Sequence, residues 1–366
     1  MVTYSKIIKK LSADVPFVGP EAQERLLGSV FKVRLGANES VFGPSEKAII
    51  AMQNCISKDV WKYGDPENYD LRNEIAKRMN LGHYNVIIGE GIDGLLGYLI
   101  RLIIEPGTKV ISSLGAYPTF NYHVRGSGGE LIFVPYYKDH ENLDSLIKAA
   151  SKSGAKLIYF ANPDNPMGTV HSAKKIEEII KKIPDDCLLS IDEAYADFSP
   201  EEFIPNIDIE NNRVIRFRTF SKAYGLAGAR IGYAIGSKEL IRNFDKVRNH
   251  FGVNRIAQIG ALAALDDKNH LIKVQKSVQL AKKQIEIISQ ENNLSTIKSF
   301  ANFVAIDCGK KGDYAYKVMQ KLIEYGVFVR MPSVAPLNRC IRLTVGRNLD
   351  LNYFAEQLPK ALKQAL

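Results

Sequence analysis

The chain has 366 residues, more than a single hydrophobic core usually holds, which predicts a large domain together with a smaller one. Hydrophobic residues make up 46% and charged residues 24% of the sequence, as in ordinary globular proteins. The formal net charge is +9, but lysines and arginines are scattered among acidic residues, which indicates a solvated surface rather than a nucleic-acid site. The longest apolar run, LLGYLIRLII, is too short for a bilayer and contains Arg101.

The N-terminal residues show no apolar core followed by a small-residue cleavage site, so we expect no secretory signal and a cytoplasmic protein. The four cysteines are widely spaced, with no CxxC pair and no histidine cluster nearby. They predict buried free thiols rather than a disulfide framework or a metal site, at Cys55, Cys187, Cys308 and Cys340.

Short apolar runs alternate with amphipathic helical patterns between about residues 45 and 250. This rhythm predicts an α/β fold whose mostly parallel sheet is covered by helices on both faces. Ligands bind such sheets at the carboxyl ends of the strands. The seven strands are expected at residues 84–88, 109–113, 130–134, 156–160, 187–191, 213–217 and 229–235.

We expect residues 46–254 to form the large, cofactor-binding domain. In residues 255–366 a long helical stretch leads into short strands and a C-terminal helix, which predicts a smaller α+β domain. Residues 1–45 are expected to form an N-terminal arm and part of the small domain.

The stretch TFSKAYGLAGAR, between two expected strands, holds a lysine among hydroxyl groups and glycines. A lone loop lysine is ordinarily a solvated side chain. The amine of Lys222 can condense with a carbonyl group, and its neighbours can hold a phosphate ester. Only a cofactor that carries both an aldehyde and a phosphate, such as pyridoxal 5′-phosphate (PLP), needs these groups together. The phosphate candidates are Thr219, Ser221 and Arg230.

Polar side chains also follow two other expected strands. In IDEAYADF, Asp192 stands where a strand ends, and Tyr195 follows three residues later. A carboxylate there keeps a pyridine nitrogen protonated, and a phenol bonds the ring oxygen. A helix-capping aspartate is the structural alternative. The segment ANPDNPMG predicts a rigid turn, which can serve the fold alone. The functional interpretation is that this turn points Asn165 at the same ring oxygen.

The segment GEGIDG, at residues 89–94, matches the GxGxxG spacing of dinucleotide-binding loops. A dinucleotide site also needs an acidic residue at the end of the next strand, and SSLGAYP has none. The alternative is a single phosphate held by the backbone N–H groups of Ile92 and Asp93, which follow Gly91 at a helix N-terminus. We favour this phosphate site.

An aromatic residue and two arginines complete the set of candidates. Phe120, in AYPTFNY, can stack on a flat ring, although a lone phenylalanine is more often a core residue. Arg330 and Arg342 end short strands of the expected small domain, where guanidinium groups can bind a substrate anion bidentately. Either arginine alone is more often an ordinary surface residue.

In their order, NPDNPMG, DEAY, TFSKAYGLAGAR and CIRLTVG resemble the histidinol-phosphate aminotransferase family of fold-type-I PLP enzymes, in the class II subgroup. The similarity extends from RLGANES to CIRLTVG, nearly the whole chain. It implies transamination between histidinol phosphate and 2-oxoglutarate in histidine biosynthesis, with PLP as cofactor and no metal.

The resemblance also implies individual roles. Lys222 would be the Schiff-base lysine, and Asp192 would face the pyridine nitrogen. Tyr195 and Asn165 would bond the ring oxygen, and Phe120 would take the stacking position. The phosphate would be held by Thr219, Ser221, Arg230 and the backbone of Ile92 and Asp93.

Four further residues are implied to complete the site. Tyr63, in WKYGDPEN, matches a tyrosine that reaches the partner subunit's phosphate, so a homodimer is expected. Asn38 matches an asparagine that lines the substrate cleft. Arg342 and Arg330 match arginines that bind the substrate's carboxylate or phosphate.

The sequence departs from the family pattern near the substrate. Phe17 stands where a tyrosine is frequent, Ile92 replaces a small hydroxyl residue, and MPSVAPLN differs from the usual glycine-containing loop. Asp164 and Met167 replace the usual Asn and Thr. These departures leave the cofactor chemistry intact and leave phenylalanine as the alternative amino donor.

Three other functions compete with transamination. A PLP-dependent decarboxylase would share every cofactor-binding residue. A nicotinamide oxidoreductase depends on GEGIDG alone, without the ribose-binding acid. A non-catalytic regulator on this fold would need a DNA-binding module, which we do not expect here.

Overall fold

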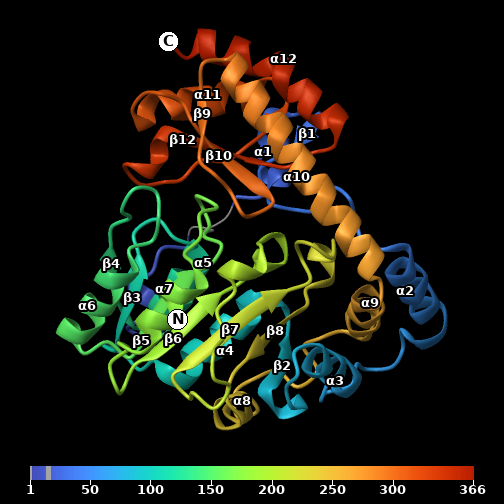
Figure 1. The fold of residues 1–366 in the computed structure, drawn as a ribbon, viewed down its shortest axis with the longest axis vertical. Coiled ribbons are helices and arrows are strands. Elements are labelled where there is room, and N and C mark those ends of the chain that lie inside the picture. Colours follow the sequence, from blue (N-terminus) through green and yellow to red (C-terminus); the bar gives the residue numbers. More distant parts are fainter. Residues whose placement is uncertain (1, 14–17) are drawn as a thin grey trace.

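The computed structural model describes residues 2–13 and 18–366 and shows a larger lower domain and a smaller upper one (Figure 1). The large domain is built on a seven-stranded sheet in the order β2-β8-β7-β6-β5-β3-β4. Its strands are β2 (Val86–Gly89), β3 (Lys109–Ser113), β4 (Glu130–Val134), β5 (Leu157–Ala161), β6 (Leu188–Asp192), β7 (Val214–Thr219) and β8 (Gly232–Ile235).

The sheet is mostly parallel, as predicted. Strand β8 runs antiparallel to both of its neighbours, β2 and β7, whereas β4, β3, β5, β6 and β7 pair in parallel. The α/β class and the seven strands are therefore confirmed. The last strand begins at Gly232, three residues later than the expected start at Ala229.

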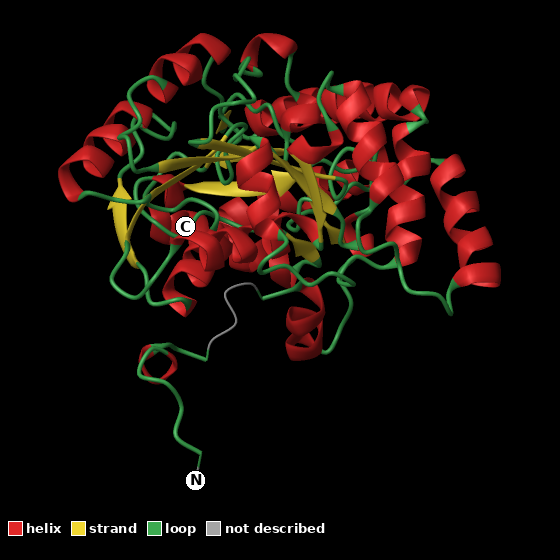
Figure 2. Cartoon of the chain, turned by 90° about the horizontal axis from the view of Figure 1, so that it is seen from below, coloured by secondary structure: helices red, strands yellow, loops and turns green. Residues whose placement is uncertain are grey.

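Helices cover both faces of this sheet, and Figure 2 shows the strands lying between layers of helices. One face packs against α4 (Gly91–Ile103), α5 (Pro118–Gly126) and α8 (Lys238–Phe244). The other packs against α6 (Leu143–Ser153) and α7 (Ala173–Ile180). Near β2 and β8 that second face is covered by α2 (Glu46–Asp59), α3 (Tyr69–Arg78) and α9 (Arg255–Leu265).

The small domain has its own core. One of its sheets is antiparallel, with the strand order β12 (Cys340–Thr344), β10 (Phe303–Asp307), β9 (Ser295–Thr296). In the other, β1 (Val33–Arg34) pairs in parallel with β11 (Val327–Phe328). Its helices are α1 (Pro20–Leu27), α10 (Lys268–Glu291), α11 (Gly312–Glu324) and α12 (Asn348–Gln364). Short 3-10 helices lie at Ile8–Lys10, His83–Asn85, Ala196–Phe198, Glu201–Phe203, Ala227–Ala229 and Leu337–Arg339.

The domains join at two places along the chain. Val33 and Leu35 lie in the small-domain core, so residues before 45 contribute to that domain. Helix α9, which follows residue 254, packs with α2 and α3 on the large sheet, whereas α10 crosses into the small domain (Figure 1). The change of domain therefore falls between α9 and α10, beyond the expected boundary.

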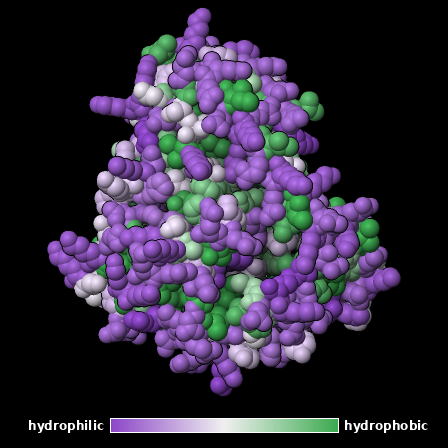
Figure 3. All heavy atoms as spheres, viewed as in Figure 1, coloured by the Kyte–Doolittle hydropathy of each residue, from purple (hydrophilic) through white to green (hydrophobic). Residues whose placement is uncertain are grey.

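Polar side chains cover most of the face shown in Figure 3, and the apolar side chains on it form small separate groups. No helix within residues 2–13 and 18–366 is long and apolar enough to cross a membrane.

Candidate active site

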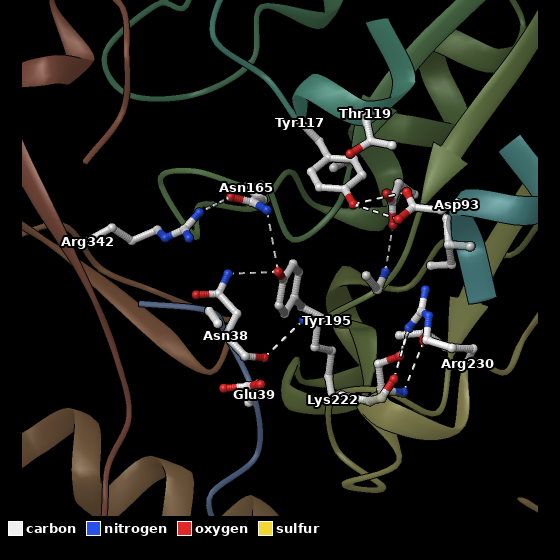
Figure 4. A pocket seen from close by; sticks show the side chains of 18 of the residues that line it. Asn38, Glu39, Asp93, Tyr117, Thr119, Asn165, Tyr195, Lys222, Arg230 and Arg342 are labelled. Atoms are coloured by element: carbon white, nitrogen blue, oxygen red, sulfur yellow. Dashed lines mark hydrogen bonds between the residues drawn. The ribbon is translucent and has the colours of Figure 1, made fainter. Parts of the chain in front are cut away.

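The carboxyl ends of the central strands open into a cavity of about 440 Å³ at the junction of the two domains. Side chains from both domains point into it (Figure 4). The cavity is lined by Ala37, Asn38, Glu39, Ile92, Asp93, Tyr117, Thr119, Tyr159, Ala161, Asn165, Asp192, Ala194, Tyr195, Thr219, Ser221, Lys222, Ala227, Arg230 and Arg342. Most of the residues singled out in the sequence are thus brought to one place.

Lys222 lies in the loop after β7, and its Nζ donates to the backbone oxygen of Asn38 at 3.0 Å. Burial lowers the pKa of Lys222 to about 8, and the positive charges of Arg342 and Arg230 act in the same direction. Such an amine is more often neutral near pH 7 than an exposed lysine, and a neutral amine is the nucleophilic form.

Asp192 ends β6 and is buried. Its carboxylate accepts hydrogen bonds from the hydroxyl of Tyr159 at 2.8 Å and from the backbone N–H of Ala194 at 2.9 Å. Burial raises the pKa of Asp192 to about 6, although both hydrogen bonds oppose this rise. Sequence reasoning missed Tyr159, because its only signal was one hydroxyl in an otherwise apolar strand.

The residue after Asp192 anchors the same strand end. Glu193 is buried and forms ion pairs with Arg216 at 2.7 Å and Arg218 at 2.8 Å. Burial works to raise the pKa of Glu193, but the charges of the two arginines outweigh it and hold the pKa below the usual value. These bonds fix β6 against β7, the strand that leads to Lys222.

The expectation for Phe120 is wrong. Its side chain is fully buried and stacks on Tyr159, with ring centroids 4.2 Å apart, instead of lining the cavity. Phe120 lies in the first turn of α5 and faces the sheet, whereas Tyr117 precedes that helix and lines the cavity. The Tyr117 hydroxyl donates to Asp93 at 3.0 Å, and Tyr117, not Phe120, is the aromatic residue of this segment that lines the cavity.

Tyr195 lies at the centre of a hydrogen-bond network. Its hydroxyl accepts from the side-chain amides of Asn38 at 2.9 Å and Asn165 at 3.5 Å. Burial raises the pKa of Tyr195 to about 12, so the phenol stays protonated at neutral pH. Asn165 in turn accepts from Nη1 of Arg342 at 2.6 Å, which links the large domain to the small one.

The two arginines lie at different depths. Arg342 is buried and donates to the backbone oxygen of Gly36 at 3.0 Å. Its Nε has no hydrogen-bond partner among the described residues. Burial lowers its pKa. Arg330 exchanges backbone hydrogen bonds with Arg342 but does not line the cavity, and its Nη2 donates to the oxygen of Val18 at 2.8 Å. Phe17 lies outside the described residues.

One end of the cavity is suited to a phosphate group. Helix α4 begins at Gly91, so the N–H groups of Ile92 and Asp93 lie in its first turn, where helices bind anions. A Cβ on Gly91, whose φ is +75°, would lie 2.6 Å from Nη2 of Arg230, which explains the glycine. Arg230 also donates to Ser221 at 3.5 Å, and Thr219 accepts from the Ser221 N–H at 3.0 Å.

Tyr63 does not line the cavity of this chain. Its side chain is 78% exposed and packs on the exposed ring of Phe251 at 5.0 Å between centroids. The structure therefore keeps Tyr63 apart from the other site residues within one chain.

Known proteins place the chain in a family. Residues 31–358 match the family described as aminotransferase class I and II. The chain belongs to the class I and II aminotransferases. A histidinol-phosphate aminotransferase of Caldicellulosiruptor saccharolyticus is 32% identical over 99% of this chain and 100% of that protein. One of Moorella thermoacetica is 31% identical over 95% of this chain and 90% of that protein.

Solved structures agree with this membership. The crystal structure of histidinol-phosphate aminotransferase from Sinorhizobium meliloti, in complex with pyridoxal-5′-phosphate, covers 100% of this chain and 99% of its own. Its TM-score is 0.97 at 44% sequence identity. An aspartate aminotransferase of Thermus thermophilus, at 20% identity and a TM-score of 0.83, shares the fold.

We expect Tyr159→Phe to move the acid limb of the pH–activity profile of this aminotransferase upward by about 1 pH unit. The Tyr159 hydroxyl lowers the pKa of Asp192, so its loss raises that pKa and leaves less carboxylate at any acidic pH. The measurement is kcat/KM between about pH 5 and pH 8, with exposed Tyr122→Phe as control. An unchanged acid limb would show that the hydroxyl does not support Asp192.

Proposed function

We propose that this chain is a PLP-dependent aminotransferase that moves the amino group of histidinol phosphate to an oxo acid, 2-oxoglutarate. The observation that carries the proposal is one cavity that holds a buried amine, a buried carboxyl group and an anion site at a helix N-terminus. PLP carries an aldehyde, a pyridine nitrogen and a phosphate, one group for each of these. When bound, PLP supplies the electron sink for proton removal at the substrate's Cα.

The residues of the large domain divide the work. Lys222 provides the amine that binds the cofactor and, once displaced by the donor, moves a proton from Cα to the cofactor carbon. Asp192 would keep the ring nitrogen of the cofactor protonated. Tyr195 and Asn165 would bond the ring oxygen, and Tyr117, rather than Phe120, would cover the ring face.

The phosphate of the cofactor would lie at the N-terminus of α4. The guanidinium of Arg230 and the hydroxyl groups of Ser221 and Thr219 surround this end of the cavity, and the backbone of Ile92 and Asp93 completes it. Charge-assisted hydrogen bonds and the helix dipole both favour an anion there.

The substrate side of the cavity belongs to the small domain. Arg342 is buried with a free Nε and binds the anionic group of the donor or of the oxo acid. Asn38 lines the same side of the cavity. Arg330 pairs with Arg342 through the backbone and lies outside the cavity lining. The names of the two most similar relatives described above support histidinol phosphate as the donor.

The donor is tested by adding amines to the holoenzyme and following the absorbance of the bound cofactor. We expect histidinol phosphate to convert the cofactor to its amine form at a concentration at least about ten-fold lower than phenylalanine, because a phosphate–arginine contact contributes more than about 1.4 kcal/mol. If phenylalanine converts the cofactor at the lower concentration, the assignment as an aminotransferase stands, but the amino donor is phenylalanine. Release of carbon dioxide would indicate a decarboxylase instead.

We also propose a homodimer in which Tyr63 reaches the phosphate site of the partner subunit. Exposed aromatic side chains gather at this point, with Trp61 and Tyr63 each 78% exposed and Phe251 54% exposed. Apolar surface of this kind is typical of an interface between subunits. Sedimentation velocity of the holoenzyme at micromolar concentration should give a dimer, and a monomer would contradict the shared site.

A further inference from the structure

Two carboxyl groups are buried together behind the cavity wall. Glu141 is 1% exposed and Asp164 is 2% exposed, and their carboxyl groups lie within hydrogen-bonding reach of each other. Neither residue has a role in the proposed chemistry. Two carboxylates can form a mutual hydrogen bond only when a proton lies between them.

In the described part of the chain, the carboxyl oxygens of the pair also accept four hydrogen bonds from neutral donors. Glu141 accepts from the backbone N–H of Ala161 at 2.8 Å and from the hydroxyl of Ser113 at 2.5 Å. Asp164 accepts from the hydroxyl of Tyr136 at 2.7 Å and from the backbone N–H of Met167 at 3.1 Å. None of these four donors carries a charge. If both carboxyl groups were ionised, no hydrogen-bonded cation among the described residues would offset the two negative charges.

Burial and the mutual repulsion of two negative charges favour one proton on the pair. Burial, and then the charge of Asp164, raises the pKa of Glu141 well above its usual value, whereas burial raises the pKa of Asp164 to about 6. The pair therefore keeps one proton to a higher pH than an exposed carboxyl group would. The titratable and charged groups that face the pair are Tyr136, Tyr159, Tyr195, His140, His171 and Arg342.

Asp164 also closes the turn that carries Asn165. Its backbone N–H donates to the oxygen of Thr169 at 2.9 Å, and its backbone oxygen accepts from Gly168 at 3.0 Å. The next residue, Asn165, then bonds both Arg342 and Tyr195 in the cavity. The buried pair is thus one residue away from the contact that joins the two domains at the substrate side.

We propose that Glu141 and Asp164 share one proton and act as a positioning pair, which holds Asn165, and through it Arg342, in place for the substrate's anionic group. This inference rests on the proposed aminotransferase function. Loss of the proton at alkaline pH sets two buried carboxylates against each other, opens the turn and weakens the binding of the oxo acid.

Glu141→Gln tests the shared proton, because its amide donates permanently to Asp164 while its oxygen still accepts from Ala161. The pKa of Glu141 is higher in the folded protein than in the unfolded chain. The free energy of unfolding of the wild type therefore falls as the pH rises from the unfolded-state pKa toward the folded-state pKa. The melting temperature of Glu141→Gln, minus that of wild type, should therefore increase between about pH 6 and pH 9. Exposed Glu130→Gln, on β4, should show no such increase.

Asp164→Asn is the second variant, since its amide also replaces the shared proton. For at least one of the two variants, the melting temperature minus that of wild type should increase as the pH rises from about 6 to about 9. If these melting-temperature differences stay constant between about pH 6 and pH 9 in both variants, the two carboxyl groups do not share a proton. Because these measurements use no substrate, they stand even if the proposed function fails.

The positioning role is read from steady-state kinetics. In wild type the KM for the oxo acid should rise several-fold between about pH 7 and pH 9, while in Glu141→Gln this rise of KM should be absent. An equal rise of KM in both proteins would overturn the link from the pair to Arg342, even where the melting data support the shared proton.

Discussion

The site depends on burying a lysine amine where the two domains meet. Within residues 2–13 and 18–366 no carboxylate bonds to the Nζ of Lys222, whose hydrogen-bond acceptor is the backbone oxygen of Asn38. Burial without a paired anion costs free energy and lowers the pKa of the amine, which is the property that a nucleophilic lysine needs. Arg342, also buried, adds a second positive charge from the small domain. The cavity is thereby prepared for an anionic ligand, and the docking of the small domain over the sheet maintains it.

Much of this arrangement was predictable from the sequence, because the decisive groups stand at the ends of apolar strands. The parallel strands carry Asp192 and Thr219 to one edge of the sheet, and the turn after β5 brings Asn165 to the same edge. Strand period and turn chemistry fix these positions locally. The loop that carries Lys222 joins β7 to the antiparallel β8, and it brings Arg230 to the end of the cavity formed by the N-terminus of α4. The family resemblance then supplied the roles.

The remaining features depend on tertiary packing that no local pattern reports. Tyr117 and Phe120 are three residues apart at the start of α5, and only the way this helix packs on the sheet decides which ring faces the cavity. Tyr159 bonds Asp192 because β5 and β6 pair in register. The meeting of Glu141 with Asp164 joins two loops separated along the chain. The change of domain after α9 likewise follows from the surface that this helix buries.

The central claim is that Lys222 binds the cofactor, and chemical trapping tests it most directly. The holoenzyme is reduced with borohydride, digested and examined by mass spectrometry for the peptide that carries the reduced cofactor. The account predicts the added mass on Lys222 and none in Lys222→Ala. Lys282 is the sharpest internal control, because burial also lowers its pKa to about 8, although it lies in the small domain and donates to the oxygen of Ser299. Trapping on Lys282 or on any other lysine would contradict the account.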